Sequence, residues 1–196
     1  MHNLNIYSEN VYASKTIQFL LEKHRVNSHS KHSISIFMFF RDWIRDEDFT
    51  ALLQATTDII LIIAPVSVLS FVQKNINREK IEYLSCIATL DEIEKKMSSF
   101  LVLPQRIFCK KTHHIEVTPS LTETEINVIS LYLSGMKFSF IGEILDLKSI
   151  LVKKHKVNAM NKMGLINDQS LIRHWHLLVR RRERQSQKPA RQSLAC

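Results

Sequence analysis

Lysine and asparagine side chains lie together on one side of the segment 149–163 when it is drawn as a helix. On a wheel of about 100° per residue, Val152, Ala159 and Met163 fall within about 40° of one another and are expected to face a core. The opposite side carries Lys153, Lys154, Val157, Asn158 and Asn161. In a major groove, lysine can reach guanine acceptors, asparagine can pair with adenine, and valine can contact a thymine methyl group. The pattern therefore favours the reading of base edges.

Two further basic residues of this segment, His155 and Lys156, are placed at the flanks of the wheel, where contacts with phosphates would fix the register on DNA. Bond-making chemistry is not indicated, because the chain has no glycine-rich phosphate loop, nucleophile elbow or plausible pair of carboxylates. Its three cysteines are widely spaced and form no CxxC pair, which argues against a disulfide framework or a zinc site. We expect no enzymatic activity, no cofactor and no metal.

Four helices within 118–179 are predicted to position these side chains. Thr122, followed three residues later by Glu125, is a capping-box pattern in which each side chain satisfies an amide of the first turn. The first helix is expected to run to about residue 134. The others are expected at 138–145, 149–163 and 168–179.

All three glycines of the chain fall within this helical segment. Gly135 and Gly164 stand where the first and third helices are expected to end, because glycine readily adopts the left-handed conformation of a helix C-cap. Gly142 is expected where two helices cross. The glycines therefore indicate a compact helical domain with short turns.

The segment resembles the LuxR/NarL-type (GerE-like) helix-turn-helix domain over about 60 residues. The residues that carry the resemblance are Leu121, Thr122, Glu125, Gly135, Ile141, Val152, Lys153, His155, Asn158, Lys162, Met163 and Gly164. The resemblance implies that the third helix enters the major groove. It assigns base reading to Lys153, Lys154 and Val157, and contacts with the DNA backbone to His155, Asn158 and Lys162.

Three positions depart from the pattern of that family. Lys148 stands where the family has a serine N-cap, and Leu151 stands where it has a threonine that contacts phosphate. We expect Lys148 to replace that contact with a charge. Gly142 stands where the family has alanine, at a cost of up to about 1 kcal/mol in helix propensity. The departures predict a modest intrinsic affinity for DNA, which suits a regulator that binds with a partner.

Residues 1–103 alternate between short β-branched or aromatic runs and helical patterns. Such alternation is typical of a small parallel sheet covered on both faces. The runs lie at 4–7, 33–40, 58–64 and 81–87, with helical patterns at 11–22, 47–56, 66–75 and 90–100. We therefore predict an α/β domain over 1–103, a linker at 104–117, an all-α domain over 118–179 and a disordered basic tail at 180–196. Phe71 and Val72 could either cover the sheet or form a dimer face.

An α/β sandwich before a LuxR-type domain resembles the response-regulator architecture. A phosphorylatable receiver needs two acids after its first strand, an aspartate after its third and a lysine after its last. Here only Glu9 follows the first run, and no lysine follows the last. The acceptor position falls either on Ile63 or near Asp42, depending on which run is the third strand. We expect a degenerate receiver without a phosphoacceptor, similar to the enteric accessory regulators RcsA, BglJ and FimW. That resemblance implies control of capsule, fimbrial or related surface genes.

The basic charge of the chain is concentrated at its C-terminal end. Residues 1–103 hold 11 Lys/Arg and 12 Asp/Glu, whereas residues 180–196 hold 6 and 1. This distribution favours a polyanion such as double-stranded DNA as partner. The N-terminus lacks the pattern of a signal peptide, and the longest apolar run, 59–72, is too short to span a bilayer. We expect a soluble, cytoplasmic protein that has no membrane contact and no small-molecule ligand.

Two functions fit the sequence. The first is a transcriptional regulator that reads promoter DNA as a homodimer or as a heterodimer with another regulator, independently of phosphorylation. The second is an adaptor or anti-activator that binds another regulator and touches DNA poorly. The residues at 148 and 151 favour the adaptor, and the lysines of the third helix favour the regulator.

Overall fold

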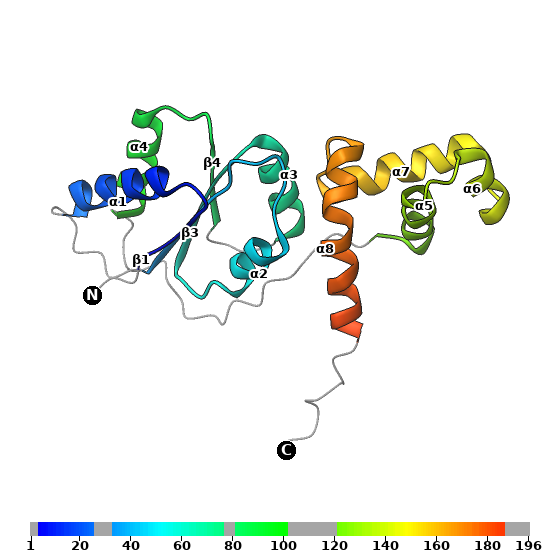
Figure 1. Cartoon of the computed structure of the whole chain (residues 1–196), viewed down its shortest axis with the longest axis horizontal. Coiled ribbons are helices and arrows are strands. Elements are labelled where there is room, and N and C mark those ends of the chain that lie inside the picture. The colour runs from blue at the N-terminus through cyan, green and yellow to red at the C-terminus, as the bar shows by residue number, and fades with distance from the viewer. Residues whose placement is uncertain (1–3, 26–32, 77–80, 102–120, 187–196) are drawn as a thin grey trace, which may run out of the picture. The chain divides into compact units, whose positions relative to one another are not determined.

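The computed structural model describes residues 4–25, 33–76, 81–101 and 121–186 (Figure 1). The chain divides into two compact units, Met1–Ser120 and Leu121–Cys196. The linker expected at 104–117 lies outside the described residues. Each unit is built from its own secondary structure.

The N-terminal unit contains a four-stranded sheet in which every pair of neighbouring strands is parallel. Its strands follow the order of the sequence: β1 (Leu4–Ser8), β2 (Ile34–Met38), β3 (Ile59–Ala64) and β4 (Ile81–Ser85). Every residue of β2 and β3 is buried, as expected for near-continuous apolar strands covered on both faces. The predicted α/β fold with a small parallel sheet is confirmed.

Two helices cover each face of this sheet (Figure 1). On one face, α1 (Val11–Arg25) and α4 (Leu90–Leu101) pack against alternate residues of the strands, such as Ile36 and Leu61. On the other face lie α2 (Asp46–Gln54) and α3 (Val66–Asn75), whose Phe49 and Phe71 rings are 5.4 Å apart. Phe71 and Val72 are fully buried. They therefore cover the sheet, which decides between the two alternatives left by the sequence.

The helices on opposite faces give the crossovers of this sheet two different hands. The chain steps across the sheet in one direction from β1 to β4. However, α1 lies on one face, whereas α2 and α3 lie on the other (Figure 1). The first crossover therefore has the opposite hand to the next two, although nearly all such crossovers are right-handed. An open sheet of order 2-1-3-4-5 gives this arrangement when its second strand is omitted. In the complete sheet, the first helix leads from strand 1 to strand 2, away from strand 3. Without strand 2, the same helix on the same face has to lead to strand 3, and the hand of the crossover is reversed.

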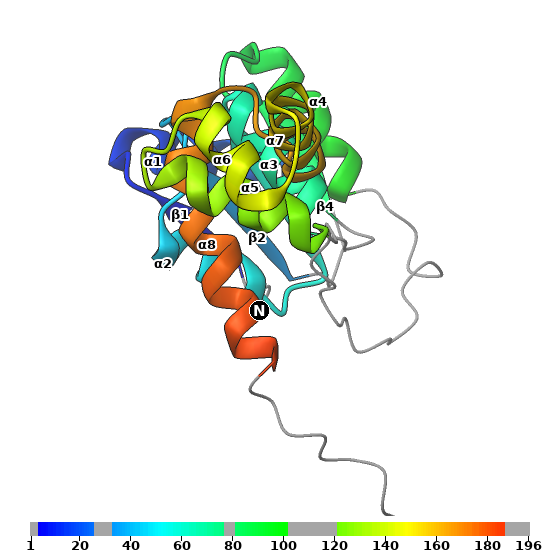
Figure 2. The same cartoon turned by 90° about the vertical axis from the view of Figure 1, so that its right-hand side faces the viewer.

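The C-terminal unit consists of α5 (Glu123–Leu133), α6 (Phe138–Leu145), α7 (Ser149–Met163) and α8 (Asp168–Ser186), shown from two sides in Figures 1 and 2. Its capping box is confirmed: the Thr122 hydroxyl accepts a hydrogen bond from the Glu125 amide at 3.2 Å, and the Glu125 carboxylate accepts one from the Thr122 amide at 2.9 Å. Gly135 and Gly164 have φ angles of +89° and +69°. Both glycines are therefore used for the left-handed conformation, as predicted.

The last helix is longer than the sequence pattern indicated. Helix α8 continues to Ser186, so the first part of the segment 180–196, which we expected to be disordered, is helical. The reason is that arginine, glutamate and glutamine are good helix formers, and the first proline of this segment is Pro189. Residues 187–196 lie outside the described part of the chain. None of the described helices is both long enough and apolar enough to cross a membrane.

Candidate nucleic-acid interface

The two faces predicted for α7 are present in the structure. Val152, Ala159 and Met163 are completely buried, and Val152 packs with Val128 of α5 and Ile141 of α6. The polar side is exposed and comprises Lys153, Lys154, Val157, Asn158 and Asn161. The three residues assigned to base reading therefore lie on the accessible side of the helix, anchored from behind by an apolar core.

A tight turn between α6 and α7 fixes where this exposed side begins. A Cβ atom on Gly142 would lie 2.4 Å from the Leu147 carbonyl oxygen, closer than real Cβ contacts allow. The Leu147 amide donates a hydrogen bond to the Gly142 carbonyl at 2.8 Å, and Asp146 between them has a φ angle of +52°. Gly142 thus permits a close backbone approach that a side chain at this position would prevent.

Three lysines at the start of α7 are accessible and electrostatically uncompensated. Lys148 is the N-cap residue, and its side chain makes no capping hydrogen bond. Among the described residues, no carboxylate lies within ion-pair distance of Lys148, Lys153 or Lys154. The Lys153 ammonium lies 5.7 Å from the centroid of the Phe138 ring, which leaves its N–H donors available. Uncompensated lysines at one end of an exposed helix face attract a polyanion.

Lys156 does not lie at an accessible flank of α7, in contrast to the sequence expectation. Its side chain is only 11% exposed, and its ammonium forms an ion pair of 2.7 Å with Asp168 at the start of α8. The same ammonium lies 3.9 Å from the centroid of the Tyr132 ring, and the Tyr132 hydroxyl donates to Asp168 at 2.7 Å. The wheel angle of Lys156 is close to that of Met163, so this lysine turns inward with the core residues. It joins α5, α7 and α8.

The protonation equilibria of this cluster favour the charged forms. Burial acts to lower the pKa of Lys156, but the hydrogen bonds and charges of Asp168 and Tyr132 outweigh it and raise that pKa. Hydrogen bonds from Lys156 and then Tyr132 lower the pKa of Asp168. Lys156 is therefore a structural cation, held in place by a carboxylate and an aromatic ring.

A second ion pair joins α7 to the capping box of α5. The Lys162 ammonium donates to the buried carboxylate of Glu125 at 2.9 Å, while its own side chain stays 40% exposed. Burial acts to raise the pKa of Glu125, yet the bonds from Lys162 and Thr122 outweigh it and lower that pKa. The charge of Lys162 is therefore compensated inside the domain. The contacts of Lys162, His155 and Asn158 with the DNA backbone stay predictions.

Sequence reasoning overlooked the apolar residues on the exposed side of the helix-turn-helix. Ile150 and Leu151 of α7 are 72% and 41% exposed, and Phe140 and Ile144 of α6 are also exposed. The signal was present in the spacing, because Ile150 precedes Lys154 by four residues and Val157 by seven. Residues at these spacings lie on the same face of a helix. The exposed side of α7 is therefore partly apolar at its start.

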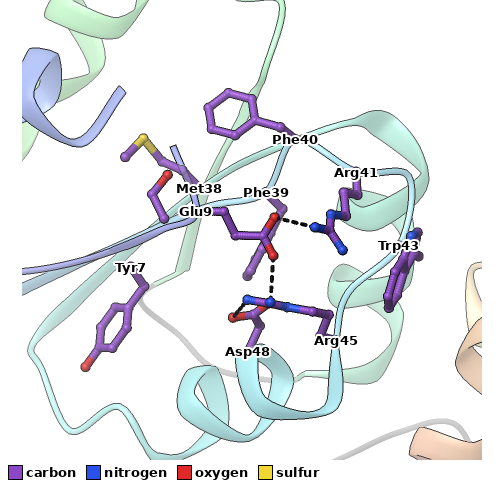
Figure 3. A pocket seen from close by; sticks show the side chains of 10 residues that line it. Tyr7, Glu9, Met38, Phe39, Phe40, Arg41, Trp43, Arg45 and Asp48 are labelled. Carbon is purple, nitrogen blue, oxygen red and sulfur yellow. Dashed lines mark hydrogen bonds and ion pairs between the residues drawn. The ribbon is translucent and has the colours of Figure 1, made fainter. Parts of the chain in front are cut away.

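In the N-terminal unit, the ends of β1 and β2 border a pocket that contains a network of ion pairs (Figure 3). The Glu9 carboxylate accepts from Arg41 at 3.0 Å and from Arg45 at 2.8 Å. Arg45 also bonds Asp48 at 2.9 Å, and this hydrogen bond is the main cause of the raised pKa of Arg45. Two guanidinium groups thus occupy the place where ligands bind in open parallel sheets, outside the carboxyl ends of the strands.

The position of Asp42 follows from the strand order. Strand β2 is the neighbour of β1, so it takes the place of the third strand in the order 2-1-3-4-5, and Asp42 rather than Ile63 follows it. The Asp42 carboxylate accepts a hydrogen bond of 3.4 Å from the Ser67 hydroxyl. It takes no part in the ion-pair network of Glu9, Arg41, Arg45 and Asp48. Among the described residues, no group of three or more histidine, cysteine, aspartate or glutamate side chains could hold a metal ion.

These features define a two-domain architecture of the response-regulator type, with a receiver-like α/β unit followed by a helical unit. Residues 119–175 match the family of bacterial regulatory proteins called the luxR family. The C-terminal unit therefore carries a LuxR-family (GerE) domain, as the sequence motifs indicated. No curated protein sequence matches the chain.

Solved structures of the response regulator RcsB are similar to most of the chain, across both units. One, of two RcsB dimers bound to two parallel DNAs, is 15% identical with a TM-score of 0.58, and the match covers 90% of this chain and 98% of that one. An RcsB–DNA complex is 13% identical, with the same coverage and a TM-score of 0.55. At this identity the likeness establishes the fold of both units and their order along the chain.

Proposed function

We propose that the protein is a transcriptional regulator that reads promoter DNA with the exposed side of α7. The observation that carries the proposal is the accessible Lys153, Lys154 and Val157 face, with uncompensated lysines, within a LuxR-family domain. Lysine donors suit guanine acceptors, and Val157 suits a thymine methyl group. Lys148, His155, Asn158 and Lys162 are proposed to contact the DNA backbone and so fix the register.

The proposal is tested by crosslinking the tagged protein to DNA in cells and sequencing the bound fragments. Discrete promoter peaks are expected for the wild type and are expected to disappear in the Lys153→Ala/Lys154→Ala variant. A Lys15→Ala/Lys95→Ala variant loses the same charge from exposed positions of the N-terminal unit and should keep the peaks. Peaks that persist in the α7 variant would mean recruitment by a partner protein and would contradict base reading by these lysines.

We propose further that the protein acts as a homodimer or heterodimer and that phosphorylation does not control it. The RcsB structures contain dimers bound to DNA, which supports paired half-sites for a similar fold. Phosphorylation of an aspartate needs a cluster of acids that holds Mg²⁺. Glu9, the acid that follows β1, is bonded to two arginines, which disfavours a divalent cation at that place. Surface-structure genes remain the proposed targets, on the resemblance to the accessory regulators alone.

Incubation with acetyl phosphate and Mg²⁺ separates this proposal from a conventional receiver. We expect no gain of a phosphoryl group by intact-protein mass spectrometry and no change in DNA affinity. An Asp42→Asn variant should bind DNA like the wild type. A stable adduct that is absent from Asp42→Asn would overturn the proposal.

One observation favours the adaptor as a second candidate. Ile150, Leu151, Phe140 and Ile144 expose apolar surface on the helix-turn-helix, and such surface is common where proteins meet. The salt dependence of DNA binding discriminates between the two functions, because release of counterions by lysine–phosphate contacts makes affinity fall steeply with salt. A shallow slope together with stable capture of a partner regulator would favour the adaptor.

A further inference from the structure

Ile150 is the most exposed large apolar residue of α7, at 72%, compared with 53% for Val157 and 41% for Leu151. It is the second residue of the helix and makes no contribution to the buried core of the unit. A single exposed isoleucine is common on protein surfaces and needs no explanation by itself. Its position is informative, however, because it continues the stripe that contains Lys154 and Val157.

The start of a recognition helix is the part that reaches base edges in helix-turn-helix proteins. In this chain, two contacts already described fix that start. The close approach of Gly142 to Leu147 sets the turn before α7, and the ion pair of Lys156 with Asp168 sets its rotation. With Lys156 and Val152 directed inward, Ile150 is directed outward together with Lys154.

An isoleucine side chain can neither donate nor accept a hydrogen bond, so only an apolar feature of the groove can be its partner. The major groove offers one such feature, the C5 methyl group of thymine. Lys148, Lys153 and Lys154 surround the start of α7 and favour the approach of DNA over that of a basic or neutral protein surface.

On this basis, and resting on the proposed DNA-reading function, we propose that Ile150 is a specificity-determining residue that contacts a thymine methyl group. Val157 lies seven residues further along, which corresponds to about 10 Å along the helix axis. At about 3.4 Å per base step, this distance corresponds to roughly three steps. The half-site therefore contains two thymines about three base steps apart, whose methyl groups contact Ile150 and Val157. The guanine acceptors that Lys153 and Lys154 read lie near these thymines.

Replacement of single thymines by deoxyuridine tests the proposal, because uracil lacks only the methyl group and keeps every hydrogen-bonding atom. The probes are duplexes of a promoter fragment recovered with the wild-type protein, and affinity is measured by fluorescence anisotropy. For the wild type, uracil at the sensitive positions should weaken binding about fourfold, the effect of burying one methyl group. In Ile150→Ala, one of these positions should lose its sensitivity while the other keeps it, and Val157→Ala should show the reverse.

Two controls make each outcome interpretable. Ile172→Ala removes the same side chain from an exposed position of α8, where it is 62% exposed, and should retain both uracil effects. Ile150→Ala should leave the slope of affinity against salt unchanged, because an apolar contact releases no counterions. Uracil sensitivity that is identical in wild type and Ile150→Ala would overturn the inference. Loss of partner binding in Ile150→Ala, with DNA binding intact, would also overturn it and assign Ile150 to a protein contact. Failure of the wild type to bind any duplex would instead refute the proposed function.

Discussion

At the scale of single residues, Lys156 connects the packing of the C-terminal unit to the orientation of α7. Its ammonium is held by Asp168 and lies over the ring of Tyr132. Lys156→Ala would leave Asp168 and the Tyr132 hydroxyl without their cation. We expect a loss of about 2 kcal/mol in the free energy of unfolding, measured by urea denaturation.

A double-mutant cycle with Asp168→Asn isolates the ion pair, and the coupling should be favourable. Lys154→Ala, which removes an exposed lysine of the same helix, should unfold at the same urea concentration as the wild type. Equal stability of Lys156→Ala and Lys154→Ala would contradict the structural role given to Lys156.

We expect the stability of the protein to depend on pH through His174. Burial lowers the pKa of this fully buried histidine below its usual 6.5 and outweighs the hydrogen bond with the Ser170 carbonyl, which acts to raise it; the nearby His176 and Arg173 also lower this pKa. As pH falls below 6.5, the unfolded state therefore takes up the proton before the folded state does, and stability decreases. We expect the melting temperature to fall between pH 7.5 and pH 5.5, and to fall less in His174→Gln. An equal fall in both proteins would contradict the prediction.

The sequence predicts the placement of a side chain correctly where position and residue type agree. Lys153 and Lys154 are exposed as expected, and Thr122 caps its helix as expected. The prediction fails where the two conflict. Lys156 has a wheel angle close to that of the core residues, but because of its charge we predicted an accessible position. Its partners, Asp168 and Tyr132, are brought to it only by tertiary packing. Ile150 is the opposite case, an apolar residue on the exposed side of the helix. From sequence alone an apolar residue is expected in the core, so no function is predicted for it until its exposure is known.

At the scale of elements, the turn between α6 and α7 depends on a missing side chain. Gly142→Ala would drive a methyl group into the Leu147 carbonyl, and this clash outweighs the gain in helix propensity. We expect a loss of about 1–3 kcal/mol in the free energy of unfolding, measured by chemical denaturation. Binding of DNA by the folded fraction should also weaken, because α7 begins from this turn.

Gly135→Ala is the control for Gly142→Ala, because it replaces a glycine next to a helix without creating a clash. Its φ angle of +89° disfavours alanine, but the space around it is open. It should cost about 1–2 kcal/mol and leave α7 in place. A Gly142→Ala variant that is as stable as the wild type would show that the turn can relax without cost.

The elements themselves follow from sequence patterns more closely than the side-chain roles do. The strand at 59–64, predicted at 58–64, and the helix at 66–75 could be located from their composition, because a buried parallel strand is apolar on both faces. The strand at 81–85, predicted at 81–87, is only partly buried. The end of α8 could not be located, since a run of arginines fits both a helix and a solvated tail. The order of the strands in the sheet could not be predicted from local patterns either. For a crossover of given hand, the face that the connecting helix covers decides on which side the next strand is added.

At the scale of the whole molecule, the distribution of charge predicts a second contribution to DNA binding. The residues after 179 hold six Lys/Arg and one Asp/Glu. Replacement of Arg180, Arg181 and Arg182 by glutamine should weaken binding to all sequences equally and make the salt slope shallower. The preference for the cognate promoter over random DNA should remain. A selective loss of the cognate complex would instead assign these arginines to sequence reading.

The sequential order of the strands has a consequence for biosynthesis. In a sheet of order 2-1-3-4-5, the first strand pairs with strands on both sides, one of which is made considerably later. Here each strand pairs with the one that immediately precedes it along the chain. Each strand can therefore meet a neighbour that has already been synthesised, and no strand has to wait for a partner made much later. The unpaired backbone N–H and C=O groups along the edges of β2 and β3 therefore lack a partner only until the next strand has been made.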